Sequence, residues 1–192
     1  QLENILRELK DTKADLSSLR YIVSCCALLK NDIKKRLIEE MKCDFHECYG
    51  TAEVGVVSNL SPKDFVKKFH TVGKEVPGVV IKITDSQKNP VAIGEIGEIA
   101  CKSSMSFSRY YMNDLATQQS LKNGFFYTGD MGYLDEDGYL VFSGRKKEVI
   151  ITGGTNVFPR DIESVLSKHP KVKECAVIGV DDKRFGEAIL AL

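Results

Sequence analysis

Apolar residues recur at helical spacing in two segments near the beginning of the chain. Residues 1–10 place four leucine or isoleucine side chains on one helical face, and residues 31–42 place three apolar side chains on one face. Between them, residues 21–23 form a short apolar run that is typical of a buried strand. The alternation of helix and strand up to about residue 53 predicts a parallel sheet layer covered by helices.

The pattern of apolar and polar positions changes near Gly73. From there to Ser143, glycine and proline separate short β-rich runs, which lie at 79–83, 96–101 and 139–142. This pattern predicts an antiparallel, barrel-like sheet region, with one helix within it at 113–121.

A third pattern begins at the charged sequence Gly-Arg-Lys-Lys of residues 144–147. It is followed by a predicted strand at 148–151 and by a glycine-containing loop at 152–156. A helix is predicted to begin at Pro159, because proline is favoured in the first turn of a helix. Another strand is predicted at 175–180.

The predicted fold class is α/β in the broad, mixed α+β sense. Residues 1–72 are interpreted as the α/β portion of a large domain, and 73–143 as a β-rich subdomain of the same domain. Residues 144–192 are interpreted as a hinge and an incomplete small α+β domain. We expect a fragment of a longer protein, since the chain begins without methionine and ends within an apolar run at Leu190–Leu192.

Composition narrows the functional classes. The 192 residues carry 27 Lys plus Arg and 27 Asp plus Glu, so no net charge draws the chain to nucleic acid or to an anionic membrane. Hydrophobic residues at 43% and charged residues at 28% are typical of a soluble globular protein. No apolar run approaches the roughly 20 residues needed to span a bilayer. No signal-peptide pattern is present either, which favours a cytoplasmic location.

The six cysteines lack the regular spacing of a disulfide framework. Reduced thiols are therefore expected, and the adjacent Cys25 and Cys26 are expected to be small, buried and structural. Cys43, His46 and Cys48 raise the alternative of a zinc site. Their spacing is tight and no second Cys/His pair supplies four ligands, so metal binding by thiols is disfavoured.

Two short motifs carry candidate chemistry. Residues 49–53, Tyr-Gly-Thr-Ala-Glu, combine an aromatic face, a glycine that permits close backbone approach, a hydroxyl and a carboxylate. They lie at the predicted end of a strand, where open α/β sheets bind ligands. Asp130 follows a glycine and is suited to accepting hydrogen bonds from two ribose hydroxyls. The alternatives are an ordinary strand-to-loop turn for 49–53 and an Asx-type turn at Asp130.

Two further features carry candidate binding groups, and neither common phosphate-loop fingerprint is present. Arg145 is suited to a phosphate or a sugar, although an arginine beside two lysines is usually on a solvated surface. Gly153 and Gly154 either let a ligand chain pass close to the backbone or close a hairpin.

The order of these motifs resembles that of the adenylate-forming superfamily, which comprises acyl-CoA synthetases, peptide-synthetase adenylation domains and beetle luciferases. The resemblance runs from about Leu16 to the last residue. It is carried by LSSLRYIVSCCALL, YGTAE, GKEVPGVVIKI, GEIGEIA, FFYTGD, DEDGYLVFSGRKKEVIITGGTNVFPRDIE and DDKRFGE.

The resemblance implies a nucleotide site that uses ATP, Mg²⁺ and CoA. In it, Tyr49 stacks on adenine, and Glu53 is a catalytic residue that holds Mg²⁺ on the ATP phosphates. Asp130 binds both ribose hydroxyls, Arg145 contacts the same sugar, and Phe142 packs near the base.

The resemblance also implies roles for residues around these groups. Lys147 is the hinge about which a small C-terminal domain rotates. Gly153 and Gly154 border the tunnel for the pantetheine arm of CoA. The remaining implied nucleotide-binding residues are Cys26, Ala27, Gly50, Thr51 and Ala52.

Two departures from the family pattern lie inside the motifs. Residues 24–28 read Ser-Cys-Cys-Ala-Leu where the family usually has Ser-Gly-Gly-Ala-Pro, which predicts a smaller or altered pocket. Ala52 replaces a threonine and deletes a hydroxyl that meets a phosphate, at a cost of roughly 1.5–3 kcal/mol. The family's phosphate loop and its lysine for the first reaction step lie outside the segment, so we expect the chain alone to be unable to adenylate a carboxylate.

The sequence therefore favours a carboxylic acid–CoA ligase that acts on a fatty or aryl acid through an acyl-adenylate. One alternative is an amino-acid adenylating domain of a peptide synthetase, although FFYTGD and GRKKEVIITGGTN are more typical of the CoA-ligase branch. The other is a non-catalytic nucleotide-binding homologue, which Cys25, Cys26 and Ala52 favour. The expected partners are the small-molecule acid, ATP and CoA, and not nucleic acid. The oligomeric state is open.

Overall fold

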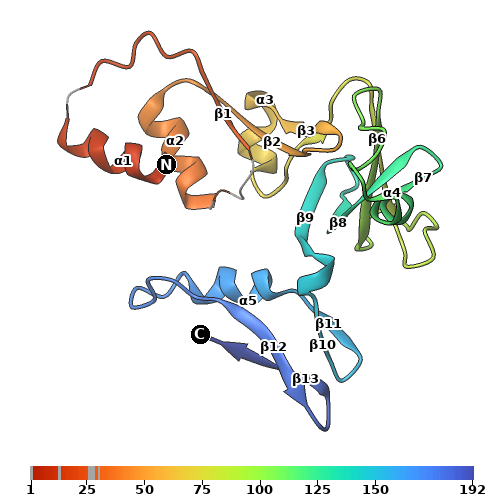
Figure 1. The fold of residues 1–192 in the computed structure, drawn as a ribbon. Coiled ribbons are helices and arrows are strands. Elements are labelled where there is room, and N and C mark those ends of the chain that lie inside the picture. The colour runs from red at the N-terminus through yellow and green to blue at the C-terminus, as the bar shows by residue number, and fades with distance from the viewer. Residues whose placement is uncertain (1, 13, 26–28, 30) are drawn as a thin grey trace.

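The computed structural model describes residues 2–12, 14–25, 29 and 31–192, and all structural statements below concern these residues. They form three sheets that follow one another along the chain, with helices packed around them (Figure 1). The fold is mixed α+β, as the sequence predicts.

The first sheet has the strand order β1–β2–β3–β4. The strands are Tyr21–Ser24, Asp44–Thr51, Gly55–Leu60 and Lys74–Glu75, and the helices beside them are α1 (Leu2–Asp11), α2 (Asn31–Met41) and α3 (Pro62–Lys68). β1 and β2 are parallel, as expected, but β3 and β4 pair antiparallel. For β2 and β3 the reason is the short connection of residues 52–54, because a parallel return needs a crossover of a dozen or more residues.

The helices bury their predicted apolar faces. Leu6 of α1 and Leu37 of α2 are almost completely buried together with Phe45 of β2. The same interior holds an ion pair between Lys34 of α2 and Glu47 of β2, whose side chains are 2% and 4% exposed. The Lys34 ammonium also donates to the carbonyl of Phe69 at 2.9 Å, so the charged pair ties α2 to β2 inside the core.

The second sheet is the predicted antiparallel, barrel-like region. Its strand order is β5–β6–β8–β7, with β9 also paired to β8. The strands are Val79–Thr84, Gly97–Ser103, Leu121–Lys122 (β7), Phe125–Leu134 (β8) and Leu140–Arg145 (β9). α4 (Asp114–Ser120) begins after Asn113, whose side chain accepts a hydrogen bond from the Ala116 N–H and caps the helix.

The third sheet follows a short 3₁₀ helix, η1 (Lys146–Glu148), and has the order β11–β10–β13–β12. β10 to β13 span Ile150–Thr152, Thr155–Val157, Val177–Asp182 and Gly186–Ala191, and α5 spans Pro159–Leu166. The predicted strand at 148–151 is wrong at its beginning because residues 146–148 form the 3₁₀ turn. Likewise, β10 and β11 form a hairpin where a loop was predicted at 152–156, and the strand predicted from residue 175 begins at Val177.

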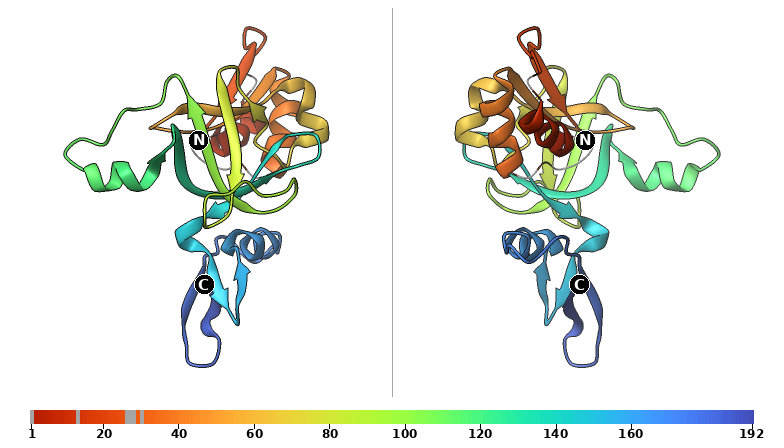
Figure 2. Two further views of the ribbon diagram at one scale, coloured as in Figure 1. Left: turned by 90° about the vertical axis from the view of Figure 1, so that its right-hand side faces the viewer. Right: turned by 90° about the vertical axis from the view of Figure 1, so that its left-hand side faces the viewer.

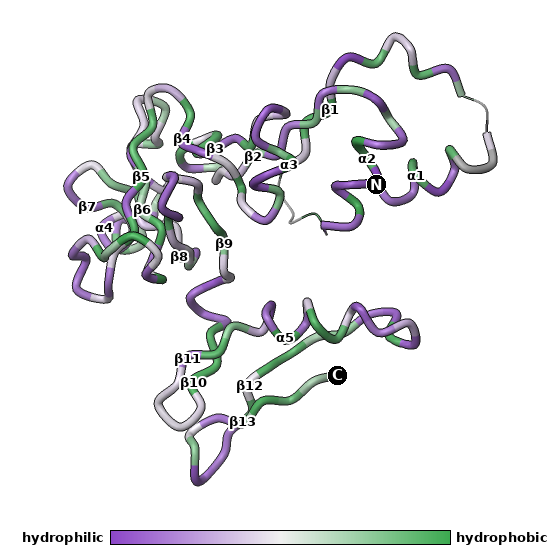
Figure 3. The backbone as a smooth tube through the Cα atoms, turned by 180° about the vertical axis from the view of Figure 1, so that it is seen from behind, coloured by the Kyte–Doolittle hydropathy of each residue, from purple (hydrophilic) through white to green (hydrophobic). Residues whose placement is uncertain are grey.

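The third sheet lies apart from the other two and is joined to them through η1 (Figure 2). Figure 3 shows this connection after β9 as a hydrophilic segment, and it contains Lys146 and Lys147. Lys146 Nζ forms an ion pair with Glu98 of β6 at 2.9 Å. Arg160 of α5 donates to the carbonyl of Phe142 in β9, so this contact joins the two sides of the connection.

None of the helices in the described part of the chain has the length and apolar character that a bilayer crossing requires.

Candidate nucleotide site

Asp130 is held in place by its own strand. The hydroxyl of Thr128 donates to the carbonyl of Ile99 on β6 at 2.9 Å and accepts the Asp130 N–H at 3.0 Å. Gly129 adopts a φ of +73°, which disfavours any residue with a Cβ. The Asx-type turn is not what positions Asp130, since the residue lies within β8 and is 2% exposed.

Tyr49, Asp130 and Arg145 meet although they lie on three different strands. The Tyr49 hydroxyl of β2 donates to Asp130 Oδ2 at 2.7 Å. Arg145 Nε lies 2.9 Å from Asp130 Oδ1, and the two residues are register partners in the β8–β9 pair. The rings of Tyr49 and Phe142 lie 6.1 Å apart. Four residues that the motifs singled out therefore form one cluster.

Burial sets the electrostatics of this cluster. Removal from water raises the pKa of Asp130, while the Tyr49 hydroxyl and the Arg145 guanidinium oppose this by stabilising the carboxylate. Burial together with the Asp130 charge also raises the pKa of Tyr49 well above its ordinary value. Tyr49 is therefore a neutral hydrogen-bond donor.

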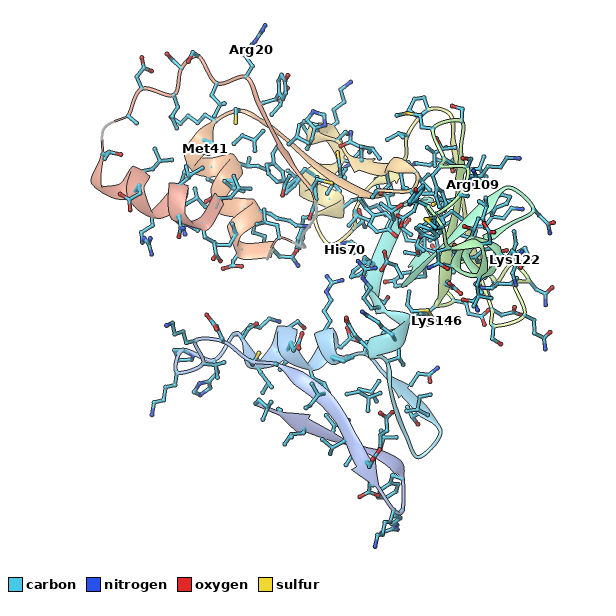
Figure 4. All side chains as sticks on the ribbon, viewed as in Figure 1. Arg20, Met41, His70, Arg109, Lys122 and Lys146 are labelled. Atoms are coloured by element: carbon cyan, nitrogen blue, oxygen red, sulfur yellow. The ribbon has the colours of Figure 1, made fainter. Side chains whose placement is uncertain are left out.

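A cavity of about 710 Å³ lies beside the cluster. Residues 50–53, at the end of β2 and in the turn that follows it, form one wall, residues 126–129 of β8 form another, and Arg145 also lines the cavity. Glu98, Tyr110 and residues of α4 complete the lining. Figure 4 shows side chains gathered where β8 and β9 meet the strands of the first sheet, with Lys146 at the connection to the third sheet.

The β2–β3 turn is shaped to present polar groups to this cavity. A Cβ on Gly50 would lie 2.3 Å from the carbonyl oxygen of Gly55, so only glycine fits there without a shift of the backbone. Thr51 Oγ1 is buried and has no hydrogen-bond partner among the described residues. A buried hydroxyl without a partner is costly, which points to a ligand that would satisfy it.

Glu53 differs from Asp130 in its partner. The Tyr110 hydroxyl donates to Glu53 Oε1 at 2.8 Å, and within the described residues Glu53 forms no ion pair. The described residues also contain no group of three or more His, Cys, Asp or Glu side chains that could hold a metal. Mg²⁺ commonly binds through one or two carboxylates and the phosphates of its substrate. A single carboxylate without an ion pair in the described part of the chain, such as Glu53, therefore fits this ion.

The remaining predicted residues lie around a second cavity or elsewhere. Lys147 lies in η1 and lines a cavity of about 670 Å³ together with Phe142, Arg145 and Arg160. Gly153 and Gly154 form the turn between β10 and β11 and do not line the 710 Å³ cavity.

The cysteine predictions have mixed outcomes. Cys26 and Ala27 lie outside the described residues. Cys25 is exposed, so the expectation that it is buried is wrong. His46 Nδ1 and Cys48 Sγ both contact the side chain of Asn59, and no metal-binding group forms there among the residues described.

Tyr110 and Glu98 are site residues that the sequence motifs missed. Glu98 lines the 710 Å³ cavity and pairs with Lys88 and Lys146, whose ammonium groups outweigh the effect of burial and hold its pKa below the ordinary value. Glu98 lies within the GEIGEIA motif but was assigned no role there, and Tyr110 lies in none of the quoted motifs. The contact of Glu98 with Lys146 spans 48 positions, and that of Tyr110 with Glu53 spans 57.

Comparisons with known proteins give a consistent result. Residues 1–111 match the family model described as AMP-binding enzyme, and residues 161–192 match the model described as AMP-binding enzyme C-terminal domain. The chain is 35% identical over 196 residues to the indoleacetate–CoA ligase of Aromatoleum aromaticum. The alignment covers all of this chain and 38% of that relative. The chain thus spans less than half of the relative's length.

Two groups of solved structures are similar as well. The o-succinylbenzoate CoA synthetase of Bacillus subtilis, in complex with its acyl-adenylate intermediate, has a TM-score of 0.89 at 31% identity, over 98% of this chain and 39% of that one. The same enzyme is also known in complex with ATP and magnesium ion. The amide bond synthetase of Marinactinospora thermotolerans has a TM-score of 0.88 at 34% identity, over 98% and 39%.

Proposed function

The chain belongs to the AMP-binding enzyme family, and from that premise we propose that it carries the nucleoside half of the active site of a carboxylic acid–CoA ligase. The observation that carries the proposal is the contact of Asp130 with both Tyr49 and Arg145 beside a cavity. A buried carboxylate between a phenol and a guanidinium is suited to a polar, uncharged ligand group such as a ribose diol.

The Asp130 carboxylate keeps unused acceptor sites for that diol. An ionised carboxylate offers about four lone-pair sites. The Tyr49 hydroxyl occupies one on Oδ2 of Asp130, while Oδ1, which forms the ion pair with Arg145, is buried and accepts no hydrogen bond from the described residues. Two ribose hydroxyls can therefore donate to the same carboxylate without displacing either neighbour. The Tyr49 ring packs near Phe142, and adenine would stack on it.

The proposed chemistry has two steps. A carboxylate oxygen attacks the α-phosphorus of ATP, the acyl-adenylate forms, and pyrophosphate leaves. The CoA thiolate then attacks the acyl carbon, the thioester forms, and AMP leaves. Glu53 would hold Mg²⁺, which when bound neutralises charge on the phosphates. The Thr51 hydroxyl would donate to a phosphate oxygen, and Arg145 would hold the sugar.

Replacing Thr51 by valine is expected to weaken ATP binding roughly tenfold, the cost of one hydrogen bond to a charged group. The free energy of unfolding should not fall, because the buried hydroxyl has no partner to lose among the described residues. Calorimetric titration with ATP and urea unfolding measure the two quantities. The exposed Thr155 provides a matched control, Thr155→Val. Unchanged ATP affinity in Thr51→Val would contradict a role in phosphate binding.

We further propose the division of the chain into residues 1–72, 73–143 and 144–192, with Lys147 as the hinge. The ion pair of Lys146 with Glu98 supports this proposal, because it fixes the connection on the side of the second sheet. A rotation about Lys147 would break the hydrogen bond from Arg160 to the carbonyl of Phe142. It would also change the orientation of the β10–β11 turn relative to the second sheet. Gly153 and Gly154 would then border the pantetheine arm of CoA.

Exchange of this segment into a relative tests the ligase assignment. A hybrid indoleacetate–CoA ligase, in which this chain replaces the matching 38% of the enzyme, would receive indoleacetate, ATP, Mg²⁺ and CoA. We expect mass spectrometry to find indoleacetyl-CoA and AMP. Binding of AMP by the hybrid reports that the segment has folded. For the 192-residue chain alone, we expect AMP binding without acid-dependent pyrophosphate exchange.

Other products would favour the alternatives. Acyl-AMP without thioester would favour an adenylating domain of the peptide-synthetase type. AMP binding without either product, unchanged by Ala52→Thr, would favour a non-catalytic homologue. A second candidate function is transfer of the acyl group to an amine, which the similarity to an amide bond synthetase favours. Supplying an amine in place of CoA and finding the amide would support that candidate.

Two finer assignments, the substrate class and the location, belong to the same proposal. A fatty or aryl acid is proposed as substrate because the relative named above acts on indoleacetate. A cytoplasmic location is proposed because Cys43, Cys48, Cys101 and Cys175 are thiols. Burial raises the pKa of the Cys101 thiol to about 12, so this cysteine is unreactive.

A further inference from the structure

Glu53 accepts two hydrogen bonds from the segment between β6 and α4. Its carbonyl accepts the Phe107 N–H at 2.7 Å, and its carboxylate accepts the Tyr110 hydroxyl at 2.8 Å. Glu53 lies in the turn that follows β2, where no regular hydrogen-bond ladder fixes a side chain. The orientation of its carboxylate therefore depends on the segment that contains Phe107 and Tyr110.

That segment is itself anchored. The Phe107 ring packs against Tyr110 at 4.7 Å and meets the edge of Phe126 of β8 at 5.5 Å. The Tyr110 N–H donates to the Thr117 hydroxyl of α4 at 3.0 Å. Tyr110 is thus held by ring packing on one side and by α4 on the other, and its hydroxyl lies at the wall of the 710 Å³ cavity.

The two carboxylates of the site differ in their charged neighbours: Asp130 pairs with a cation, whereas Glu53 pairs with none among the described residues. Asp130 is neutralised by the Arg145 guanidinium at 2.9 Å, which suits a ligand without charge. Glu53 receives only the hydroxyl of Tyr110, and no cation of the described residues pairs with it. A phenol orients one carboxylate oxygen without cancelling the charge. The other lone pairs of Glu53 stay available to a cation in the cavity.

We propose that Tyr110 is a positioning residue that orients Glu53 toward the divalent cation accompanying the ATP phosphates. This inference rests on the proposed nucleotide site. Tyr110 need not touch the cation or the nucleotide, because its hydroxyl acts through Glu53 Oε1. Groups that orient a metal ligand in this way influence metal affinity strongly, whereas they leave binding of a metal-free ligand largely unchanged.

Tyr110→Phe tests the proposal, because it keeps the ring packing and removes only the hydroxyl. We expect the Mg²⁺ concentration that gives half-maximal ATP binding to rise roughly tenfold. AMP affinity without Mg²⁺ should stay within about twofold, since the nucleoside contacts are intact. Titration calorimetry on the 192-residue chain measures both. The adjacent Tyr111 is 90% exposed, so Tyr111→Phe is the matched control and should match the unsubstituted chain.

A second variant shows whether Tyr110 acts through Glu53. Glu53→Gln is expected to weaken the Mg²⁺ dependence of ATP binding, and adding Tyr110→Phe should then change nothing further. An additional loss in the double variant would overturn the proposal. So would an unchanged Mg²⁺ midpoint in Tyr110→Phe, or an equal loss of AMP affinity, which would mark a merely structural role. A failure of the unsubstituted chain to bind AMP would instead overturn the nucleotide site, and the inference with it.

Discussion

Asp130→Asn is expected to weaken AMP binding by roughly 100-fold, because two hydrogen bonds from ribose to a charged acceptor are worth about 3 kcal/mol together. The amide has the shape of the carboxylate but carries no charge. It also leaves the Arg145 guanidinium without its partner at 2.9 Å. Calorimetric titration with AMP measures the effect.

Asp181→Asn is the matched control for Asp130→Asn. Asp181 is an exposed residue of β12 in the third sheet and does not line the 710 Å³ cavity. The control removes the same charge from the same residue type, and AMP affinity should not change. Equal affinity of Asp130→Asn and the unsubstituted chain would show that ribose does not bind at Asp130, and the proposed nucleoside site would then be wrong.

The pH dependence of AMP binding follows from the same carboxylate. Burial raises the pKa of Asp130, so the group takes up its proton at a higher pH than an ordinary aspartate, whose pKa is about 3.9. A protonated carboxyl is a poorer acceptor of ribose hydroxyls. AMP affinity should therefore fall on acidification, beginning above the range of an ordinary aspartate, and Asp130→Asn should remove this dependence.

Lys34→Met is expected to lower the free energy of unfolding by roughly 3–5 kcal/mol, because it leaves the buried Glu47 carboxylate without its cation. The Lys34 and Glu47 side chains are almost inaccessible to water. Burial lowers the pKa of Lys34 and raises that of Glu47, and their mutual attraction opposes both shifts. Urea unfolding followed by circular dichroism measures the loss.

Two companion variants identify the cause of this loss. Lys34→Met combined with Glu47→Leu should recover much of the stability, because an apolar pair can replace a buried ion pair at little cost. Arg36→Met removes the partly exposed pair with Glu40 on the same helix and should cost roughly 0.3–0.5 kcal/mol. A Lys34→Met variant no less stable than Arg36→Met would contradict a buried, ionised pair at this position.

The buried pair also bears on the site. Glu47 precedes Tyr49 by two residues in β2, and alternate residues of a strand share a face. The pair therefore fixes α2 against the strand that presents Tyr49 to Asp130. Loss of Lys34 should weaken AMP binding only to the extent that β2 loosens. The double variant with Glu47→Leu should recover the free energy of unfolding and the AMP affinity together.

Local patterns in the sequence predicted most of the helices and strands, because the periods of apolar residues are properties of short segments. The helices at the beginning of the chain, the helix after Asn113 and the strand run at 79–83 are confirmed. The antiparallel return of β3 was missed. It depends on the connection of residues 52–54, which is too short for a crossover. In the sequence, these residues are interpreted as part of a ligand-binding motif and not as the turn of a hairpin.

What the sequence determined by itself is the set of chemical groups and their order along the chain: a tyrosine and a carboxylate at 49–53, Asp130 after a glycine, and Arg145 before a charged connection. Only the tertiary structure decided which groups touch. Tyr49 reaches Asp130 across 81 positions, and Tyr110 reaches Glu53 across 57. Such pairs arise from strand register and from the packing of separate sheets, and no local periodicity encodes them.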